Sequence, residues 1–591
     1  MPIVVFATTL VVYLVTAGPT FYWLDSGEFV AAAWGLGVAH PPGHPLAALI
    51  NRLFCYVPVG TIGFRLNLAC AVQSAATVAL IAAIARRGLS QLYGLRVATF
   101  AAAASAYVAA FSYALWFQAV RAEVYALNAL LIAAIFYVLL RFAQQGDRRL
   151  VPIAALLVGL ALCNHHLLVL LAAPAGLVFL LRGVEVNWRA IILRTIVAGL
   201  LGLATLAYLP LRAANSPRVD WGKPTSVERF GWVVSARIFQ RTVSRVSARQ
   251  TASERLSGGA FAVMGAIGPA ASLLALAGLY LLWRRQQTRR LGIAVTVGVL
   301  GNLVSPLLVG FDAYNPDAYG YLAVTVVLLA LPLAALLAVV LAQLQRVPKR
   351  AAIAACAVVL LPLPTSQLVS QFSRCNLRGH WVAEESARRL LDLPEDSLVL
   401  SHYFGTLFGL WALRETADLR PDIDLLQRSF VTHPGFIEDV EQRTPRLASL
   451  ARSLASAQPA LDALDRLAAG RPVFFEYDVS LSAALTERLA PAGPLARYHS
   501  ARATAARPAR EGDREIHRRR MARWQSAALD LADYESRRAV VWQHYRLAEL
   551  SCRRSAYREL AHLHLRAALA LAPADQALHR LARRCRLEPS G

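Results

Sequence analysis

Two carboxylates and two histidines lie close together near the start of the chain, in the stretch LDSGEFVAAAWGLGVAHPPGHP. Asp25 and Glu28 are three residues apart, so both carboxylates share one face if a helix begins there. A carboxylate positioned in this way can act as a general base toward an attacking hydroxyl. The structural alternative is a carboxylate version of the capping box, in which Asp25 is the N-cap and Glu28 the third helical residue.

His40 and His44 lie on a segment, HPPGHP, that cannot be helical. Two consecutive prolines remove backbone donors and hold the preceding residues extended, so the sequence predicts a rigid turn. The two imidazoles can donate hydrogen bonds to a phosphate, or they can lie at a membrane interface and bond backbone carbonyls. No further residues have the spacing of a metal site, so none is predicted, and a requirement for a divalent metal stays open.

Further polar residues interrupt the apolar sequence downstream. The candidates for a binding site with the two histidines are Arg121, Glu123, Tyr125, His165, His166, Arg212, Trp221, Asp312 and Asp317. Most of them also have a structural interpretation. The arginines can extend from a membrane interface toward water, the aspartates can stabilise turns, and the tryptophan can anchor the chain at the lipid surface.

The composition places these residues in a membrane protein. Of 591 residues, 57% are hydrophobic and only 17% are charged, a balance that water-soluble proteins rarely reach. The excess of basic over acidic residues, 61 − 37 = +24, falls largely in short gaps between apolar runs. That distribution orients membrane helices and argues against a nucleic-acid partner.

The site must be positioned by membrane helices, each of which needs ~20 apolar residues. Apolar runs of about this length mark them in the sequence. We predict eleven spans: 2–20, 64–85, 97–118, 124–141, 151–163, 167–181, 190–210, 260–283, 291–310, 320–344 and 351–371. Asn164, His165 and His166 would form the tip of a tight hairpin, because arginines flank both ends of the region 151–181. A signal peptide is the alternative for the first span, but no Lys or Arg precedes it.

Every second gap between the predicted spans is basic. These gaps fall at 86–96, 141–149, 182–194, 284–290 and 346–350, and the positive-inside rule places them in the cytoplasm. The remaining gaps hold all the polar candidates. The sequence therefore predicts that the candidates gather at the extracytoplasmic face.

The hydropathy falls after Gln371, and we predict an extracytoplasmic tail. Residues 1–371 form the expected membrane domain, 372–513 a mixed α/β domain with strands at 397–404 and 471–479, and 514–591 a helical region. Within it, 557–585 resembles a helical hairpin of the tetratricopeptide kind. Cys552 and Cys585 can pair if the tail is extracytoplasmic.

The motifs resemble the transmembrane protein 260 family, also called domain of unknown function 2723. The resemblance covers about residues 1–430 and rests on DSGEF (25–29), HPPG (40–43), RAEVY (121–125), DWG (220–222), NPD (315–317) and RPDIDLL (420–426). His44 departs from the family pattern, and residues 430–591 do not match it. The animal member of the family is a protein O-mannosyltransferase, and the family resembles the GT-C membrane glycosyltransferases.

The resemblance implies a mainly α, GT-C-like integral membrane enzyme, and the Arg- and Ala-rich composition favours a bacterial inner membrane. It would transfer a sugar, mannose in the family, from a polyprenyl-phosphate donor to an extracytoplasmic acceptor protein or glycan. Because the leaving group is already a phosphate, one base suffices, and the implied base is Asp25, with Glu28 orienting it or the acceptor. His40, Arg121 and Arg212 would hold the lipid phosphate. A transporter or lipid flippase, or a non-catalytic scaffold, is the alternative.

Overall fold

The computed structural model describes residues 1–180, 188–240, 251–345, 348–456, 460–500, 515, 517–519, 521, 533–553 and 557–586. The chain forms two compact units. The helical unit comprises Met1–Pro19, Leu36–Asn215 and Pro224–Gly379, and the tail unit comprises Thr20–Gly35, Ser216–Lys223 and His380–Gly591. The sequence assigned 20–35 and 216–223 to the membrane domain, whereas in the structure these two segments pack with the tail.

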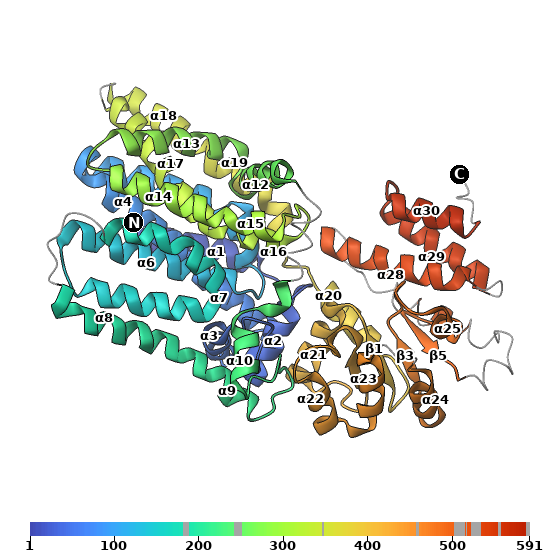
Figure 1. The fold of residues 1–591 in the computed structure, drawn as a ribbon. Helices are drawn as coiled ribbons and strands as arrows, with labels where there is room; N and C mark the ends of the chain where they lie inside the picture. The colour runs from blue at the N-terminus through green and yellow to red at the C-terminus, as the bar shows by residue number, and fades with distance from the viewer. Residues whose placement is uncertain are drawn as a thin grey trace. The chain divides into compact units, whose positions relative to one another are not determined.

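The helical unit consists of helices that lie side by side (Figure 1). Their bounds are α1 (Pro2–Thr16), α3 (Pro45–Cys55), α4 (Ile62–Ala110), α5 (Tyr113–Ala119), α6 (Tyr125–Gln145), α7 (Leu150–Leu180), α8 (Trp188–Leu203), η1 (Ala204–Ala207), α9 (Tyr208–Ala213), α10 (Val227–Val234), η2 (Arg237–Phe239), α12 (Ala252–Ile267), α13 (Pro269–Arg284), α14 (Arg289–Asn302), α15 (Val304–Val309), α16 (Pro316–Gly320), α17 (Ala323–Leu344), α18 (Lys349–Leu360) and α19 (Pro362–Cys375). A helix satisfies its own backbone hydrogen bonds, as a membrane-spanning segment must, because lipid tails offer no hydrogen-bond partners.

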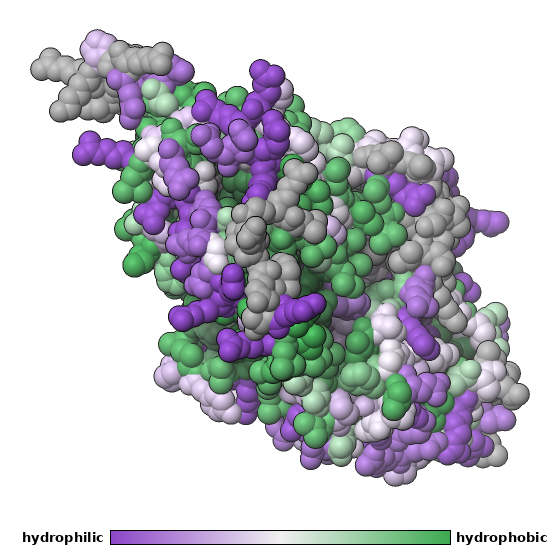
Figure 2. Space-filling view, turned by 60° about the vertical axis from the view of Figure 1, so that its left-hand side comes forward, coloured by the Kyte–Doolittle hydropathy of each residue, from purple (hydrophilic) through white to green (hydrophobic). Residues whose placement is uncertain are grey.

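The protein is an integral membrane protein. Seven of the described helices are long and apolar enough to cross a bilayer, or up to eight if the bent pair α12 and α13 is one span. Leu193 and Leu201 of α8 are 70% and 65% exposed, as expected for side chains that face lipid. Hydrophobic patches and separate clusters of hydrophilic side chains are visible on the face drawn in Figure 2. The count of eleven spans stays a prediction.

Helix α7 folds back on itself at the predicted hairpin tip. His165 has φ −149° and ψ 84°, which are not helical angles. Leu150 and Leu180, the two ends of α7, pack in the same hydrophobic cluster with Phe142. The two halves of α7 are therefore antiparallel, and His165 lies at the turn between them.

Helix α4 folds back in the same way at Gly94, whose φ of 77° suits a residue without a Cβ. Asn67 Nδ2, near the start of α4, donates to the Gly18 carbonyl at 2.7 Å. At the other end, the Tyr13 hydroxyl donates to the Ala110 carbonyl at 2.8 Å. Both ends of α4 thus lie beside the end of α1, and Gly94 lies at the opposite end of the unit.

Two of the arginine-rich gaps meet at the Gly94 end. The Arg285 guanidinium carbon lies 5.1 Å from the centroid of the Tyr93 ring. A Cβ at Gly88 would lie 3.1 Å from Leu291 Cδ2. The gaps 86–96 and 284–290 therefore share one end of the helical unit, as their common charge predicts.

The tail unit is a five-stranded sheet with helices. Its elements are α2 (Ser26–Gly35), α20 (Val382–Leu390), β1 (Leu398–Ser401), α21 (Phe404–Ala417), β2 (Asp424–Gln427), η3 (Arg428–Phe430), α22 (Phe436–Arg443), η4 (Pro445–Leu447), α23 (Ala448–Ala455), α24 (Leu461–Gly470), β3 (Val473–Phe475), α25 (Ala483–Thr486), β4 (Leu489–Ala492), β5 (Leu495–Tyr498), α28 (Tyr534–Cys552), α29 (Arg558–Leu571) and α30 (Gln576–Arg584). The strand order is β2-β1-β3-β5-β4, with β1 parallel to β2 and β3, and β5 antiparallel to β3 and β4.

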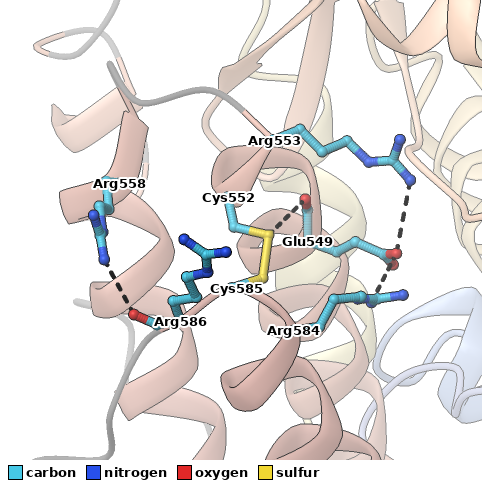
Figure 3. The surroundings of a disulfide bond; sticks show 7 residues. All are labelled: Glu549, Cys552, Arg553, Arg558, Arg584, Cys585 and Arg586. Atoms are coloured by element: carbon cyan, nitrogen blue, oxygen red, sulfur yellow. Dashed lines mark hydrogen bonds and ion pairs between the residues drawn. A yellow bond between two sulfur atoms is a disulfide. The ribbon is translucent and has the colours of Figure 1, made fainter.

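The structure confirms the two predicted strands as β1 and β3. It also confirms the predicted helical pair as α29 and α30, although its likeness to a tetratricopeptide unit stays a prediction. Most of residues 514–532 lie outside the described part of the chain. A disulfide joins Cys552 and Cys585, and Figure 3 shows Arg553 and Arg584 directed toward the Glu549 carboxylate beside it.

Candidate active site

A buried ion network forms at the turn between α5 and α6. Arg121 is 0% exposed, and one of its guanidinium nitrogens donates to Glu123 Oε1 at 3.0 Å. The other donates to Gln118 Oε1 at 2.9 Å and to Asp317. The interpretation of Arg121 as a side chain that extends to water is wrong, because its charge is buried and neutralised by two carboxylates. A guanidinium buried in this way is tolerated only with such partners.

The network fixes the position of α16 against α5. Asn315 caps α16 by accepting from the Asp317 backbone N–H at 2.9 Å, which orients Asp317 at the first turn. Gln118 Nε2 donates to the Pro316 carbonyl at 2.8 Å. Residues about 200 positions apart in the sequence are thereby joined at one end of the helical unit.

This end is the one opposite the arginine-rich gaps. The Gly18 N–H donates to the Val120 carbonyl at 3.0 Å, directly before Arg121. Gly18 also accepts from Asn67 at the start of α4, far from the turn at Gly94. Within the helical unit, the motif around Arg121 therefore lies at the end opposite the two basic gaps 86–96 and 284–290.

Histidine and tyrosine rings form a second group at the tips of α6 and α7. Ring centroids are 5.1 Å apart for His40 and His44, and 5.9 Å apart for His44 and His165. His165 lies 5.8 Å from Tyr125 and 5.5 Å from Tyr321. The structure thus brings four predicted residues together and adds Tyr321.

His44 bonds a backbone carbonyl, as the structural alternative predicts for it. Its Nδ1 lies 2.6 Å from the Asn164 carbonyl oxygen, which can only accept, so Nδ1 carries the proton in this contact. The residue is 2% exposed and adopts φ 46° at the N-cap of α3. His166, next to His165, is half-buried.

Arg212 supports the segment that leads into the HPPGHP turn. Its Nε donates to the Leu36 carbonyl at 2.7 Å, and the Tyr208 hydroxyl donates to the Gly37 carbonyl at 2.9 Å. Both donors come from α9. At the turn, Gly43 has φ 92°, and a Cβ there would lie 2.7 Å from a methyl carbon of a leucine on α9. Only glycine fits this backbone position.

Asp25 and Glu28 belong to the tail unit. The helix α2 begins directly after Asp25, whose carbonyl accepts from the Phe29 N–H at 3.0 Å, and Glu28 is 0% exposed in its first turn. A Cβ at Gly27 would lie 2.7 Å from the Phe408 carbonyl oxygen of α21. The glycine of DSGEF is therefore needed for the close packing of α2 on α21.

Three hydrogen bonds hold the residues before Asp25 to the rest of the tail unit. Thr20 Oγ1 donates to Glu384 at 2.5 Å, and the Tyr22 hydroxyl donates to Asp533 at 2.8 Å. The third runs from Trp23 Nε1 to the Ser536 hydroxyl, also at 2.8 Å. Nothing in the sequence pairs Tyr22 or Trp23 with residues more than 500 positions later.

Two further candidates lie apart from both groups of the helical unit. Asp312 is exposed and accepts from the Tyr314 N–H at 2.9 Å, so it stabilises a turn. Trp221 belongs to the tail unit, where its ring centroid lies 4.5 Å from Phe430 and 5.6 Å from His433. Gln118 belongs to the ion network and Tyr321 to the ring group, but neither was predicted. Neither residue lies in a sequence motif that would have marked it as a candidate.

Comparison with known sequences matches residues 25–188 to the family described as the protein O-mannosyl-transferase TMEM260 N-terminal domain. Protein O-mannosyl-transferase TMEM260 of Mus musculus is 27% identical over 471 residues, which cover 75% of this chain and 64% of the mouse protein. The Dictyostelium discoideum protein of the same name is 25% identical over 248 residues, or 39% of this chain and 29% of that protein. The chain thus spans less than two thirds of the length of either relative.

Comparison of folds finds the crystal structure of ArnT from Cupriavidus metallidurans bound to undecaprenyl phosphate. The TM-score is 0.50 at 13% sequence identity, and the match covers 80% of this chain and 92% of ArnT. This likeness concerns the fold alone. The motifs, the matched family and the fold agree, and the resemblance of this chain to the transmembrane protein 260 family is confirmed.

Proposed function

We propose that the protein is a GT-C membrane glycosyltransferase that moves a sugar from a polyprenyl-phosphate donor to a hydroxyl of an extracytoplasmic acceptor. The observation that carries the proposal is the match of residues 25–188, which begins at Asp25, to the N-terminal domain of named O-mannosyl-transferases. Those names favour mannose as the sugar and a protein serine or threonine as the acceptor. The undecaprenyl phosphate bound in the ArnT crystal structure supports a lipid-linked donor.

The proposed reaction needs one base. The acceptor oxygen forms a bond to the anomeric carbon while the bond from that carbon to the phosphate oxygen breaks, and the hydroxyl proton must leave. We assign the proton to the Asp25 carboxylate, a role worth about 10²–10⁴-fold in rate. The buried Glu28 carboxylate, one turn further along, would orient Asp25 or the acceptor. The phosphate leaves without a proton, so no second acid is required.

We assign the donor phosphate to His40 and Arg212. Arg212, on α9, donates to the carbonyl of Leu36, four residues before His40, and so supports the segment that carries His40. Arg121 already has two carboxylates and an amide as partners. We therefore propose that the main role of Arg121 is to hold Glu123 and Asp317 in place around the donor. Direct binding of the phosphate, which the motif predicts for Arg121, is the lesser part of its role.

The disulfide supports an extracytoplasmic location for the tail. Structural disulfides persist in oxidising compartments, and the pair Cys552–Cys585 lies in the tail unit. An acceptor that is a secreted or surface protein would meet the enzyme on that side. This location agrees with the one that the basic gaps predict for the polar motifs.

The test is sugar transfer by the purified Asp25→Asn protein, with a radiolabelled polyprenyl-phosphate sugar and an acceptor protein. Loss of the base predicts a rate reduced by about 10²-fold or more with donor binding retained. Asp147→Asn is the matched control, because Asp147 is an exposed aspartate between α6 and α7 that caps a turn. Near-normal transfer by the folded Asp25→Asn protein would exclude the assigned base. Movement of intact labelled lipid without transfer would instead identify a flippase.

A further inference from the structure

A cavity of about 250 Å³ lies within the tail unit, and none of the groups assigned to the reaction lines it. One wall is a face of α28, where Glu535, Arg538, Trp542 and Arg546 are spaced by three or four residues. This spacing places all four on one side of the helix. Other positions of α28, such as Val541, pack in a hydrophobic cluster. The helix therefore buries apolar side chains elsewhere and presents a polar and aromatic face to the cavity.

Aromatic rings from distant parts of the chain line the cavity. They are Trp23 before α2, Tyr403 before α21, Tyr477 after β3 and Trp542 of α28. Trp542 is 45% exposed although its ring offers a large apolar area, and the neighbouring Tyr545 ring holds it edge-on at 5.2 Å. An exposed tryptophan face is electron-rich and attracts the polarised C–H bonds of a sugar ring.

The charged groups of the lining balance one another. Among the described residues that line the cavity, two are glutamates and two are arginines. They are paired: Arg538 lies 3.3 Å from Glu535, and Arg546 lies 3.1 Å from Glu476. A phosphate or nucleotide site would carry a net positive charge, so this arrangement disfavours an anionic ligand. Carboxylates accept and guanidinium groups donate, which together suit hydroxyl groups that do both.

Glu476 is a fixed acceptor at the base of the wall. Its Oε2 accepts from the backbone N–H groups of His402 and Tyr403, both at 2.9 Å. Its Oε1 accepts from the Thr406 hydroxyl at 3.0 Å and from Arg546. With only 8% of the residue exposed, the carboxylate cannot reorient freely. A polar wall that is already held in place loses little conformational entropy when a ligand binds.

We propose that this cavity binds a neutral saccharide of one or two rings. The volume is smaller than the ~300–1,000 Å³ of pockets for larger ligands, which limits the occupant to a small unit. Stacking on Trp542 and hydrogen bonds to the paired charges would hold the ring. The proposal does not depend on the glycosyl transfer proposed above. If both hold, the tail recognises acceptors that already carry sugar.

The cavity touches the segment that carries the proposed base. Trp23 lines it and donates to Ser536 at the start of α28, and Asp25 follows two residues later. A saccharide against Trp23 would restrain this segment. Binding is therefore expected to change the environment of the DSGEF helix as well as that of α28.

The test is saturation-transfer NMR with the full chain in lipid nanodiscs and methyl glycosides of glucose, galactose and mannose. At least one neutral glycoside should bind, and Trp542→Ala should weaken it about tenfold or more. Trp381→Ala is the matched control, because Trp381 is also 45% exposed in the tail unit but does not line the cavity. Glu535→Gln removes an acceptor charge and should also weaken binding.

Several outcomes would overturn the proposal. The proposal fails if no neutral glycoside binds, or if wild type and the folded Trp542→Ala protein bind equally well. It also fails if glucuronate binds more strongly than the neutral sugars, or if an unglycosylated serine-rich peptide binds in place of sugar. None of them bears on sugar transfer by Asp25. Failure here therefore leaves the proposed reaction to its own test.

Discussion

The helical unit and the tail unit treat buried polar side chains differently. In the helical unit, the buried arginine, its carboxylate partners and the histidine rings gather at one end. In the tail unit, buried polar groups such as Glu384, Arg471 and Glu549 are spread through the fold, each with partners nearby. Convergence of costly groups in one place indicates a site, whereas dispersed and satisfied groups indicate stabilisation of the fold.

Among the single substitutions, removal of the buried cation should give the largest effect. Arg121→Gln leaves the buried Glu123 and the partly buried Asp317 without their shared cation, so we expect a loss of about 3–5 kcal/mol in unfolding free energy. Arg285→Gln is the control at the Gly94 end, where the exposed guanidinium lies over Tyr93, and should cost about 0.5–1 kcal/mol. Thermal unfolding in detergent measures both. Equal losses would show that the two ends do not differ.

Acid should weaken the tail unit through a chain of three buried histidines, His517, His544 and His564. His564 contacts His544 at 2.9 Å and His517 at 3.0 Å between ring nitrogens. Burial lowers the pKa of His544 to about 4, and burial together with His544 lowers the pKa of His517 to about 4. Burial, reinforced by the two neighbouring rings, also lowers the pKa of His564.

The sign follows from proton binding. Above pH ~6.5 neither state binds a proton at these rings, so their protonation does not affect stability. Between pH ~6.5 and about 4 only the unfolded state binds protons at His544 and His517, and stability falls as the pH is lowered, by up to about 3 kcal/mol for each of these two histidines at 1.36 kcal/mol per pKa unit. Denaturation followed across this range should show the loss, and His544→Gln should reduce it. A pH-independent tail would contradict the lowered pKa values.

A smaller effect should come from the contact of α2 with α21. Gly27→Ala places a Cβ 2.7 Å from a backbone oxygen, and overpacking of this kind costs about 1–3 kcal/mol. Gly470→Ala is the control, because nothing lies within 4 Å of a Cβ at Gly470. Limited proteolysis of the tail unit measures the difference. If both variants resist proteolysis like wild type, the packing of α2 is looser than the structure indicates.

The hairpin turn of α7 could be predicted from the sequence, because charge and hydropathy are local properties. The arginines on both sides of 151–181 predicted the hairpin whose tip is His165. The DSGEF motif, on which the resemblance rested, lies at the start of the region 25–188 that matches the family. The strands β1 and β3 were predicted because they lie in apolar runs, whereas polar residues or a proline interrupt β2, β4 and β5 at Asp424, Pro491 and Arg497.

What the sequence could not predict depends on contacts across long distances. The motif RAEVY does not indicate that Arg121 is fully buried, because burial of its charge depends on Asp317, 196 positions later. The stretch around DSGEF follows an apolar helix and looks like a membrane loop. Its partners, Asp533 and Ser536, lie far along the chain in a region with no family resemblance.

The attachment of residues 20–35 to the tail has a practical consequence for dissecting the protein. A fragment that starts after residue 371 would lack one of its own packing elements, and a membrane fragment that stops there would expose the face of α2 around Gly27. Neither half is a self-sufficient piece. Split reporters therefore need to leave residues 20–35 intact, since this short segment precedes most of the helical unit in sequence but packs with the tail.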